Sequence, residues 1–271
     1  MSVLKWGGRR TGTLLGLWAI VVAATLIGSL GGTTTDRAVV NALITLVLVV
    51  GVSVFVGTSG VFSFGHMSFM AIGAYTTVIL TMSDRQKGLQ LPDLPSSLAT
   101  AHVNSVAAAL IAGACAAAFA LVLSVPLMRL NGLTASLATV AVLITIRVVL
   151  QNWDRYTRGT RGLILDGAPP SRNTVLVWAL AAIAAAFFFR QSRFGVRLAS
   201  SREDEVAARS VGIRVWWERG MSFVLSAFIV ALPVMMALAS EDPVGAGART
   251  RQRVEVAQCL DGLARKWHQV R

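Results

Sequence analysis

The sequence predicts an all-α membrane protein, a polytopic bundle of about seven transmembrane helices with one short helix outside the bilayer. Apolar residues make up 55% of the 271 residues, charged residues make up only 14%, and the apolar residues form long uninterrupted runs. A soluble domain carries about a quarter charged residues, so this chain has too little polar surface to cover a fold in water. Continuous runs of about 20 residues favour spanning helices over the alternating strands of a barrel.

The apolar runs place the individual spans. The first run, at about 13–31, follows the basic residues Lys5, Arg9 and Arg10, and a cleaved signal peptide is the alternative interpretation of this segment. We favour a retained first span because the run is long and further spans follow at once. In chain order, the other predicted spans are at about 38–57, 66–82, 103–128, 133–150, 174–189 and 221–240.

The basic residues orient these spans, because Lys and Arg accumulate on the cytoplasmic side of membrane proteins. With the amino terminus in the cytoplasm, and counting only the segments before the tail at 241–271, eleven Lys and Arg side chains lie inside and seven lie outside. The same bias explains the net charge of +12, so we expect no binding of nucleic acid. Two observations fit less well: the predicted external loop at about 151–173 is basic, and seven spans leave a basic carboxyl tail outside.

The sequence contains no arrangement of residues that predicts catalysis or metal binding. Cys115 lies in an apolar run and Cys259 in the tail, so they form neither a disulfide framework nor a metal-ligand spacing. The histidines, His66, His102 and His268, are far apart. Because no nucleophile–base pair appears either, we expect no catalytic residue, no metal and no cofactor bound by this chain.

A break rich in glycine and hydroxyl groups separates the second and third predicted spans. Irregular backbone at membrane depth is tolerated only where protein buries it or where it lines a water-filled cavity. Broken helices turn free amides and carbonyls toward a polar solute, so this break is a candidate part of a translocation path. The alternative is an ordinary cytoplasmic turn, in which the glycines allow close helix packing and the histidine caps a helix. The candidate path residues are Gly57, Gly60, Ser63, Gly65, His66, Gly73 and Tyr75.

A short cytoplasmic helix is predicted between the sixth and seventh spans. Ser200 and Ser201 are N-cap candidates, and Glu203 and Asp204 each follow one of them by three residues. Acidic residues in a first turn also suit the helix dipole. The segment is therefore predicted to be a helix with a well-defined start.

The remainder of this segment completes the predicted helix. Glu205 can form an ion pair with Arg209 four residues later, and Gly212 fits a C-terminal cap. A small apolar face, too narrow for a membrane span, consists of Ala207, Ala208 and Val211. Such a helix suits docking into a groove on a soluble partner, and the alternative is a linking helix that is merely solvated.

Together these segments resemble the branched-chain amino acid permeases of the ATP-binding-cassette (ABC) transporter superfamily. The break matches that family's G-x-x-G-x-x-S-x-G-H-x-x-F-x-x-I-G-A-Y pattern. The loop at 157–170, which turn chemistry largely explains, is similar to the family's T-G-G-x-x-G-L element, with Arg158 in place of a glycine. The segment from Ser192 to Gly212 looks like the family's cytoplasmic coupling loop. The resemblance covers about 50–240.

The resemblance implies a location, a function and a set of partners. The chain would be a multi-pass permease subunit of the bacterial inner membrane, translocating branched-chain amino acids or related small polar solutes. A periplasmic or lipid-anchored solute-binding protein would deliver the solute, and a second permease subunit would complete the path. ATPase subunits would use ATP and Mg²⁺, since this chain has no G-x-x-x-x-G-K-[ST] motif and is not expected to be an enzyme. Those subunits would act on Arg202, Glu203, Asp204, Glu205, Ala207, Ala208 and Gly212.

The end of the chain departs from the family's pattern. Apolar character stops at about Ser240, so we expect a permease domain at 1–240 and a polar basic tail at 241–271, disordered or foreign to the family. Members of the family usually continue with further hydrophobic segments. Our hypothesis is a truncation, for example by a reading-frame shift, and a genuine short variant is the alternative.

Two other functions stay open on the sequence alone. A secondary transporter or channel needs no ATPase, but it is expected to carry ionisable residues within its spans. Only Arg147 comes near this, close to a span end where its side chain can reach the interface. The other alternative is a non-transporting remnant of a permease.

Overall fold

The protein is helical wherever its structure is described. The computed structural model describes residues 3–29, 33–91, 95, 103–130, 132–159 and 172–232, and these contain helices and no strand. In chain order the helices are α1 (Val3–Ser29), α2 (Thr33–Ser59), α3 (His66–Thr81), α4 (Asp84–Gln90), α6 (Ser105–Leu127), α7 (Gly132–Asn152), α8 (Asp154–Thr157), α9 (Arg172–Gln191), α10 (Arg193–Glu203), α11 (Glu205–Ser210) and α12 (Val215–Ala231). The predicted all-α class is confirmed.

Each predicted span coincides with one of these helices. Those long and apolar enough to cross a membrane are Thr35–Ser59 of α2, α6, Thr134–Asn152 of α7, and α9. The apolar part of α1, Gly12–Gly28, and the whole of α3 are shorter. The structure describes the chain as far as Leu232 at the end of α12, so the rest of the predicted last span and the tail at 241–271 lie outside the described residues.

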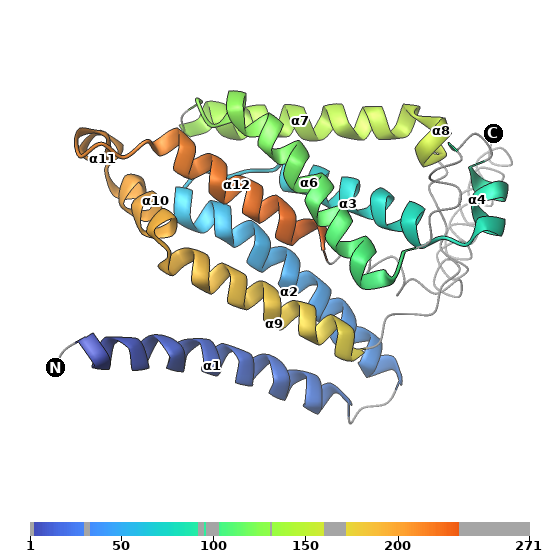
Figure 1. Ribbon diagram of the computed structural model, residues 1–271, viewed down its shortest axis with the longest axis horizontal. Coiled ribbons are helices and arrows are strands. Elements are labelled where there is room, and N and C mark those ends of the chain that lie inside the picture. The colour runs from blue at the N-terminus through green and yellow to red at the C-terminus, as the bar shows by residue number, and fades with distance from the viewer. Residues whose placement is uncertain are drawn as a thin grey trace, which may run out of the picture.

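The long helices pack as a slanted bundle (Figure 1). At its centre α2 and α12 lie side by side, α9 packs against α2, and α6 packs against both α12 and α3. At one margin α1 packs on α9 and α2, whereas at the opposite margin α7 packs on α3. The middle of the bundle is therefore built by helices far apart in the sequence.

Two apolar clusters form the interior. The first joins α1, α2, α9 and α12, and its buried members are Val21, Val40, Leu43, Ile44, Val47, Val54, Val175, Ala179, Ala182, Ile183 and Ile229. The second joins α2, α3, α6 and α12, and its buried members are Phe55, Phe69, Ala116, Ala120, Leu127, Met128, Phe223, Ala227 and Ala231. Because α2 and α12 contribute to both clusters, they connect the two halves of the bundle.

Small residues allow α6 to lie close to its neighbours. Ala108, Ala112, Ala116 and Ala120 recur every fourth residue on one face of α6 and are fully buried. Side chains of this size let helix backbones approach closely, which is the usual packing device in lipid. Large apolar side chains on the rest of α6 are exposed, for example Val122. A surface of this kind suits a bilayer, since lipid tails are as apolar as the side chains.

The short helices α10 and α11 lie together at one end of the bundle. The start of α1, the end of α2 and the start of α12 lie at this same end (Figure 1). The positive-inside bias assigned all of these segments to the cytoplasmic side. Their common position in the fold is consistent with that orientation.

Candidate functional site

The backbone is non-helical at the glycine-rich break, as the sequence predicts. Helix α2 ends at Ser59, and Gly60 follows with a φ of 71°, in the left-handed region that favours glycine. The backbone N–H of Val61 donates to Ser59 Oγ at 3.2 Å, and that of Phe64 donates to Thr139 Oγ1 on α7 at 3.2 Å. Hydroxyl groups therefore satisfy backbone donors that a helix would have paired.

His66, the first residue of α3, is buried in a polar contact between three helices. Its Nε2 lies 2.7 Å from Ser226 Oγ on α12, and that hydroxyl lies 2.6 Å from the Gly51 carbonyl oxygen on α2. A hydroxyl has a single hydrogen, and the carbonyl can only accept. Nδ1 of His66 lies 3.4 Å from the Ser63 carbonyl oxygen, so both ring nitrogens contact polar groups. The rings of Phe55, Phe69 and Phe223 surround the imidazole.

The seven candidate path residues occupy three environments. His66, Gly65 and Gly73 are buried, Ser63 and Tyr75 are half-buried, and Gly57 and Gly60 are exposed. His66 and Gly73 are contacted by α12, and Gly65 by Thr139 of α7. The structure thus brings part of the set into helix contacts, as the packing alternative expects. A role in a translocation path stays a prediction for all seven.

Gly73 and Gly57 form a matched pair for a stability test. A Cβ at Gly73 would lie 2.8 Å from the Ala231 carbonyl oxygen, whereas a Cβ at Gly57 would meet nothing within 4 Å. We expect Gly73→Ala to destabilise the protein by about 1–3 kcal/mol, the usual cost of overpacking. We expect Gly57→Ala, in helical backbone, to be neutral or stabilising. Thermal unfolding in detergent measures both, and equal midpoints for the two variants would contradict the packing role of Gly73.

The predicted cytoplasmic helix is two helices, and its predicted N-caps are wrong. Helix α10 begins directly after α9, with Ser192 as its N-cap accepting from the Gly195 N–H at 3.2 Å. Ser200 and Ser201 lie inside α10 and donate to carbonyl oxygens three residues earlier, at 2.8 and 2.7 Å. Ser200 and Ser201 satisfy the capping-box pattern, but the helix begins earlier in the chain, at the turn around Ser192.

Asp204 separates the two helices and caps the second. Its Oδ1 accepts from the backbone N–H groups of Val206 and Ala207 at 2.9 and 3.0 Å. The sequence interpretation had placed Asp204 in the first helical turn, so this is a correction. Glu203 ends α10 and is exposed.

The predicted C-terminal cap at Gly212 is confirmed. Gly212 has a φ of 86°, its N–H donates to the Arg209 carbonyl at 3.0 Å, and the Ile213 N–H donates to the Ala208 carbonyl at 3.1 Å. This pair of bonds is the Schellman arrangement. Glycine ends α11 because the left-handed conformation costs it nothing.

Glu205 joins α11 to the start of α12. It forms the predicted ion pair with Arg209, and its other oxygen accepts from Arg219 Nη2 at 3.0 Å. Burial alone would raise the pKa of Glu205, but the charges of Arg219 and Arg209 and their hydrogen bonds outweigh it, so the pKa lies below its usual value. The carboxylate is therefore ionised at neutral pH. We call Glu205, Arg209 and Arg219 the carboxylate clamp.

Arg202 joins α10 to the glycine-rich break. Its Nη1 donates to the Gly57 carbonyl oxygen at 3.0 Å, and its side chain lies against Gly60. The last carbonyl groups of a helix lack partners within the helix and attract a cation. The structure therefore brings the two motifs that the sequence singled out into direct contact.

The apolar face of α11 differs from the prediction in its members. Ala208 is buried, while Ala207 and Val211 are exposed. Val206, absent from the predicted face, is 79% exposed, and Val211 is 80% exposed. One side of α11 thus packs on the bundle, and the other presents valines to the surroundings.

The described start of the third motif has turn geometry. Thr157 Oγ1 donates to the Trp153 carbonyl at 2.8 Å and accepts from the Gly159 N–H at 3.3 Å. Arg158 has a φ of 56°, in the left-handed region. The resemblance expects a glycine at this position, and the backbone conformation gives the reason. Residues 160–170 lie outside the described residues.

Several partners in this site were missed by sequence reasoning. Ser226, Thr139 and Arg219 supply the hydrogen bonds just described, and Glu218 lies buried 3.5 Å from Arg197. One signal was available: Ser222 and Ser226 are spaced four apart within an apolar run, which predicts a polar stripe on one face of a helix. Their partners lie elsewhere in the sequence and leave no local pattern.

The fold and the site define a multi-pass membrane protein whose broken helix contacts a capped segment at one end of the bundle. A family model described as the permease component of branched-chain amino acid transport systems matches residues 34–247, and the chain belongs to this family. The resemblance of its motifs is thereby confirmed. Searches of curated proteins and of solved structures gave no match.

Proposed function

We propose that this chain is the membrane-spanning permease subunit of an ABC importer and translocates branched-chain amino acids or related small polar solutes. Its family membership supports this. In this proposal the chain hydrolyses no ATP, and soluble ATPase subunits act on α10 and α11. A second permease subunit completes the path, and a solute-binding protein delivers the solute on the other side of the inner membrane.

The observation that carries the proposal is the exposed outer face of α11. Val206 and Val211 are among the most exposed large apolar side chains described. They lie at the end of the bundle to which the positive-inside rule assigns the cytoplasm, where lipid does not cover them. Large apolar side chains that are this exposed to water are candidates for contact with a partner. A soluble subunit with an apolar groove fits this face.

Two contacts connect the helices that would bind such a partner to the long helices of the bundle. The carboxylate clamp connects α11 to α12, and Arg202 connects α10 to the end of α2. A subunit that binds one arrangement of α11 more tightly than another would bias these contacts. Because Arg202 lies against Gly60, movement of α10 would reach the break, the proposed part of the translocation path.

Charged substitutions on the outer face of α11 test the proposal. We expect the double variant Val206→Asp and Val211→Asp to lose co-purification with the ATPase subunits and to lose uptake of radiolabelled leucine. Burying two unpaired carboxylates in an apolar groove costs several kcal/mol, a loss of more than about a hundredfold in affinity. The protein should still fold, because Val206 is 79% exposed and Val211 is 80% exposed.

The control is Leu89→Asp, which places the same charge on a residue that is 75% exposed on α4, away from α11. It should keep the ATPase subunits bound. Retention of these subunits by the double variant would rule out α11 as the docking surface. A chain that takes up leucine with no ATPase subunit present would instead be a secondary transporter.

A further inference from the structure

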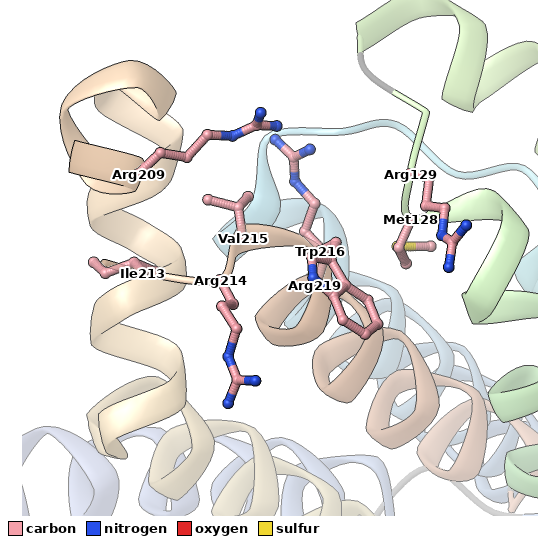
Figure 2. A pocket seen from close by; sticks show the side chains of 8 residues that line it. All are labelled: Met128, Arg129, Arg209, Ile213, Arg214, Val215, Trp216 and Arg219. Atoms are coloured by element: carbon pink, nitrogen blue, oxygen red, sulfur yellow. The ribbon is translucent and has the colours of Figure 1, made fainter. Parts of the chain in front are cut away.

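A cavity of about 480 Å³ lies between the end of α6 and the start of α12, beside α11 (Figure 2). It is lined by Met128, Arg129, Arg209, Ile213, Arg214, Val215, Trp216 and Arg219. Four of these residues are arginines and none is acidic. They come from three places in the chain, so the fold gathers them.

The positive charge in this cavity exceeds the negative charge near it. In Figure 2 the side chains of Arg209 and Arg219 lie at one side, Arg129 lies across from them, and Arg214 points away. Among the described residues, the Glu205 carboxylate is shared by Arg209 and Arg219. Arg129 forms no ion pair within the described part of the chain. A concave site lined by charges of one sign concentrates ions of the opposite sign.

The arginines and the apolar wall of the cavity together indicate which kind of anion the cavity would bind. The planar guanidinium group matches phosphate oxygens in a two-pronged geometry. Met128, Val215 and Trp216 offer apolar surface that a free phosphate ion would not use. Trp216 is 43% exposed and stands beside the exposed Trp217 at the start of a predicted span. Tryptophan is enriched at this level, where headgroups meet the hydrocarbon.

The outer surface of α6 leads from the hydrocarbon to this cavity. Leu121 and Val125 share one face of α6, and Arg129 follows two residues after the helix ends at Leu127. Leu121 and Val125 are exposed, and Arg129 is exposed at the helix end. An acyl chain lying along this face would bring its phosphate to Arg129. We propose that the cavity binds the phosphodiester headgroup of an anionic phospholipid from the cytoplasmic leaflet and thereby bridges α6 to the carboxylate clamp.

The test measures lipid binding by the purified chain. The chain is placed in nanodiscs of phosphatidylcholine with one-tenth phosphatidylglycerol or in phosphatidylcholine alone, and retained lipid is counted by native mass spectrometry. We expect selective retention of phosphatidylglycerol, and about fivefold weaker retention in Arg129→Gln, the contribution of one basic side chain near a membrane surface. Arg129→Lys keeps the charge but not the two-pronged geometry, so it should recover only part of the binding. The control is Arg193→Gln, an exposed arginine at the same end of the bundle but outside the cavity.

Three results would overturn the proposal. Equal losses in Arg129→Gln and Arg193→Gln would show a diffuse charge effect and no site. Displacement of the lipid by millimolar inorganic phosphate would show a site for the free ion. Loss of ATPase co-purification in Arg129→Gln, with unchanged lipid retention, would make the cavity a protein contact. The measurement of retained lipid needs neither transport nor the ATPase subunits, which enter only the third result, so failure of lipid binding is separate from failure of the proposed function.

Discussion

Replacing Glu205 with glutamine is expected to abolish ATP-driven uptake of solute while leaving a folded protein in the membrane. The substitution removes the carboxylate that Arg209 and Arg219 share. Exposed ion pairs contribute up to about 1 kcal/mol and broken buried ones cost about 3–5 kcal/mol, so we place this partly buried clamp near 2 kcal/mol. That energy lowers the equilibrium constant for attachment of α11 to α12 by more than about tenfold. Leucine uptake and ATPase co-purification measure the effect.

Glu203→Gln is the matched control for this substitution. Glu203 lies two residues away, is exposed and forms no ion pair among the described residues, so its replacement leaves the clamp intact and should lower uptake far less than Glu205→Gln does. The pH dependence has a definite sign. Because the pKa of Glu205 is lowered from 4.5, its contribution is fully present above that pH and is lost as the pH falls through the lower value. A clamp that weakened between pH 8 and pH 6 would contradict this account.

The second large effect is expected at Gly195, near the start of α10. A Cβ at this position would lie 2.2 Å from the Phe189 carbonyl oxygen and 2.8 Å from the Arg190 Cα. Both atoms belong to the backbone of α9, so neither can rotate away as a side chain would. We expect Gly195→Ala to displace α10, break the Ser192 cap and destabilise the protein by about 3 kcal/mol, the upper end for overpacking.

Gly212→Ala provides the comparison, because that glycine is required for a different reason. A Cβ there meets nothing within 4 Å, but the φ of 86° is unfavourable for alanine, at a cost of about 1–2 kcal/mol. The fraction of monodisperse protein in detergent and its unfolding midpoint should therefore fall further for Gly195→Ala than for Gly212→Ala. A larger decrease for Gly212→Ala than for Gly195→Ala would show that the turn between α9 and α10 accommodates a Cβ at Gly195 with less loss of stability than its backbone contacts indicate.

The spans could be predicted from the sequence because each depends on local apolar character. A run such as that in α6 must be helical in lipid whatever its neighbours are. The Gly212 cap and the Glu205–Arg209 pair are also local, and both were predicted. The start of α10 was not, because Ser200 satisfies a capping-box pattern as well as a true cap does. What decides between them is the tight turn at Gly195, and close approach to α9 is a tertiary property.

The hydrogen bonds between distant parts of the site could not be predicted from local sequence patterns. Ser226 and His66 are 160 residues apart, and Arg202 and Gly57 are 145 apart. Each residue had an ordinary local interpretation, as a helix cap, a charged surface residue or a packing glycine. Only the packing of α3 against α12 and of α10 against α2 brings the partners together. The sequence could thus indicate which segments matter, but not which atoms meet.

Arg202 and Glu205 are separated by only two residues, yet they are attached to different helices. One holds the end of α2 and the other holds the start of α12, and α2 and α12 are themselves packed along their length. A segment fastened at two such points cannot swing independently, so a load applied to it should tilt α2 and α12 together as a rigid body. Helix α7 contacts neither of them extensively, so we expect α7 not to move with them. Because α7 packs on α3 and α6, those two contacts are where we expect α7 to shift relative to the bundle when α2 and α12 tilt.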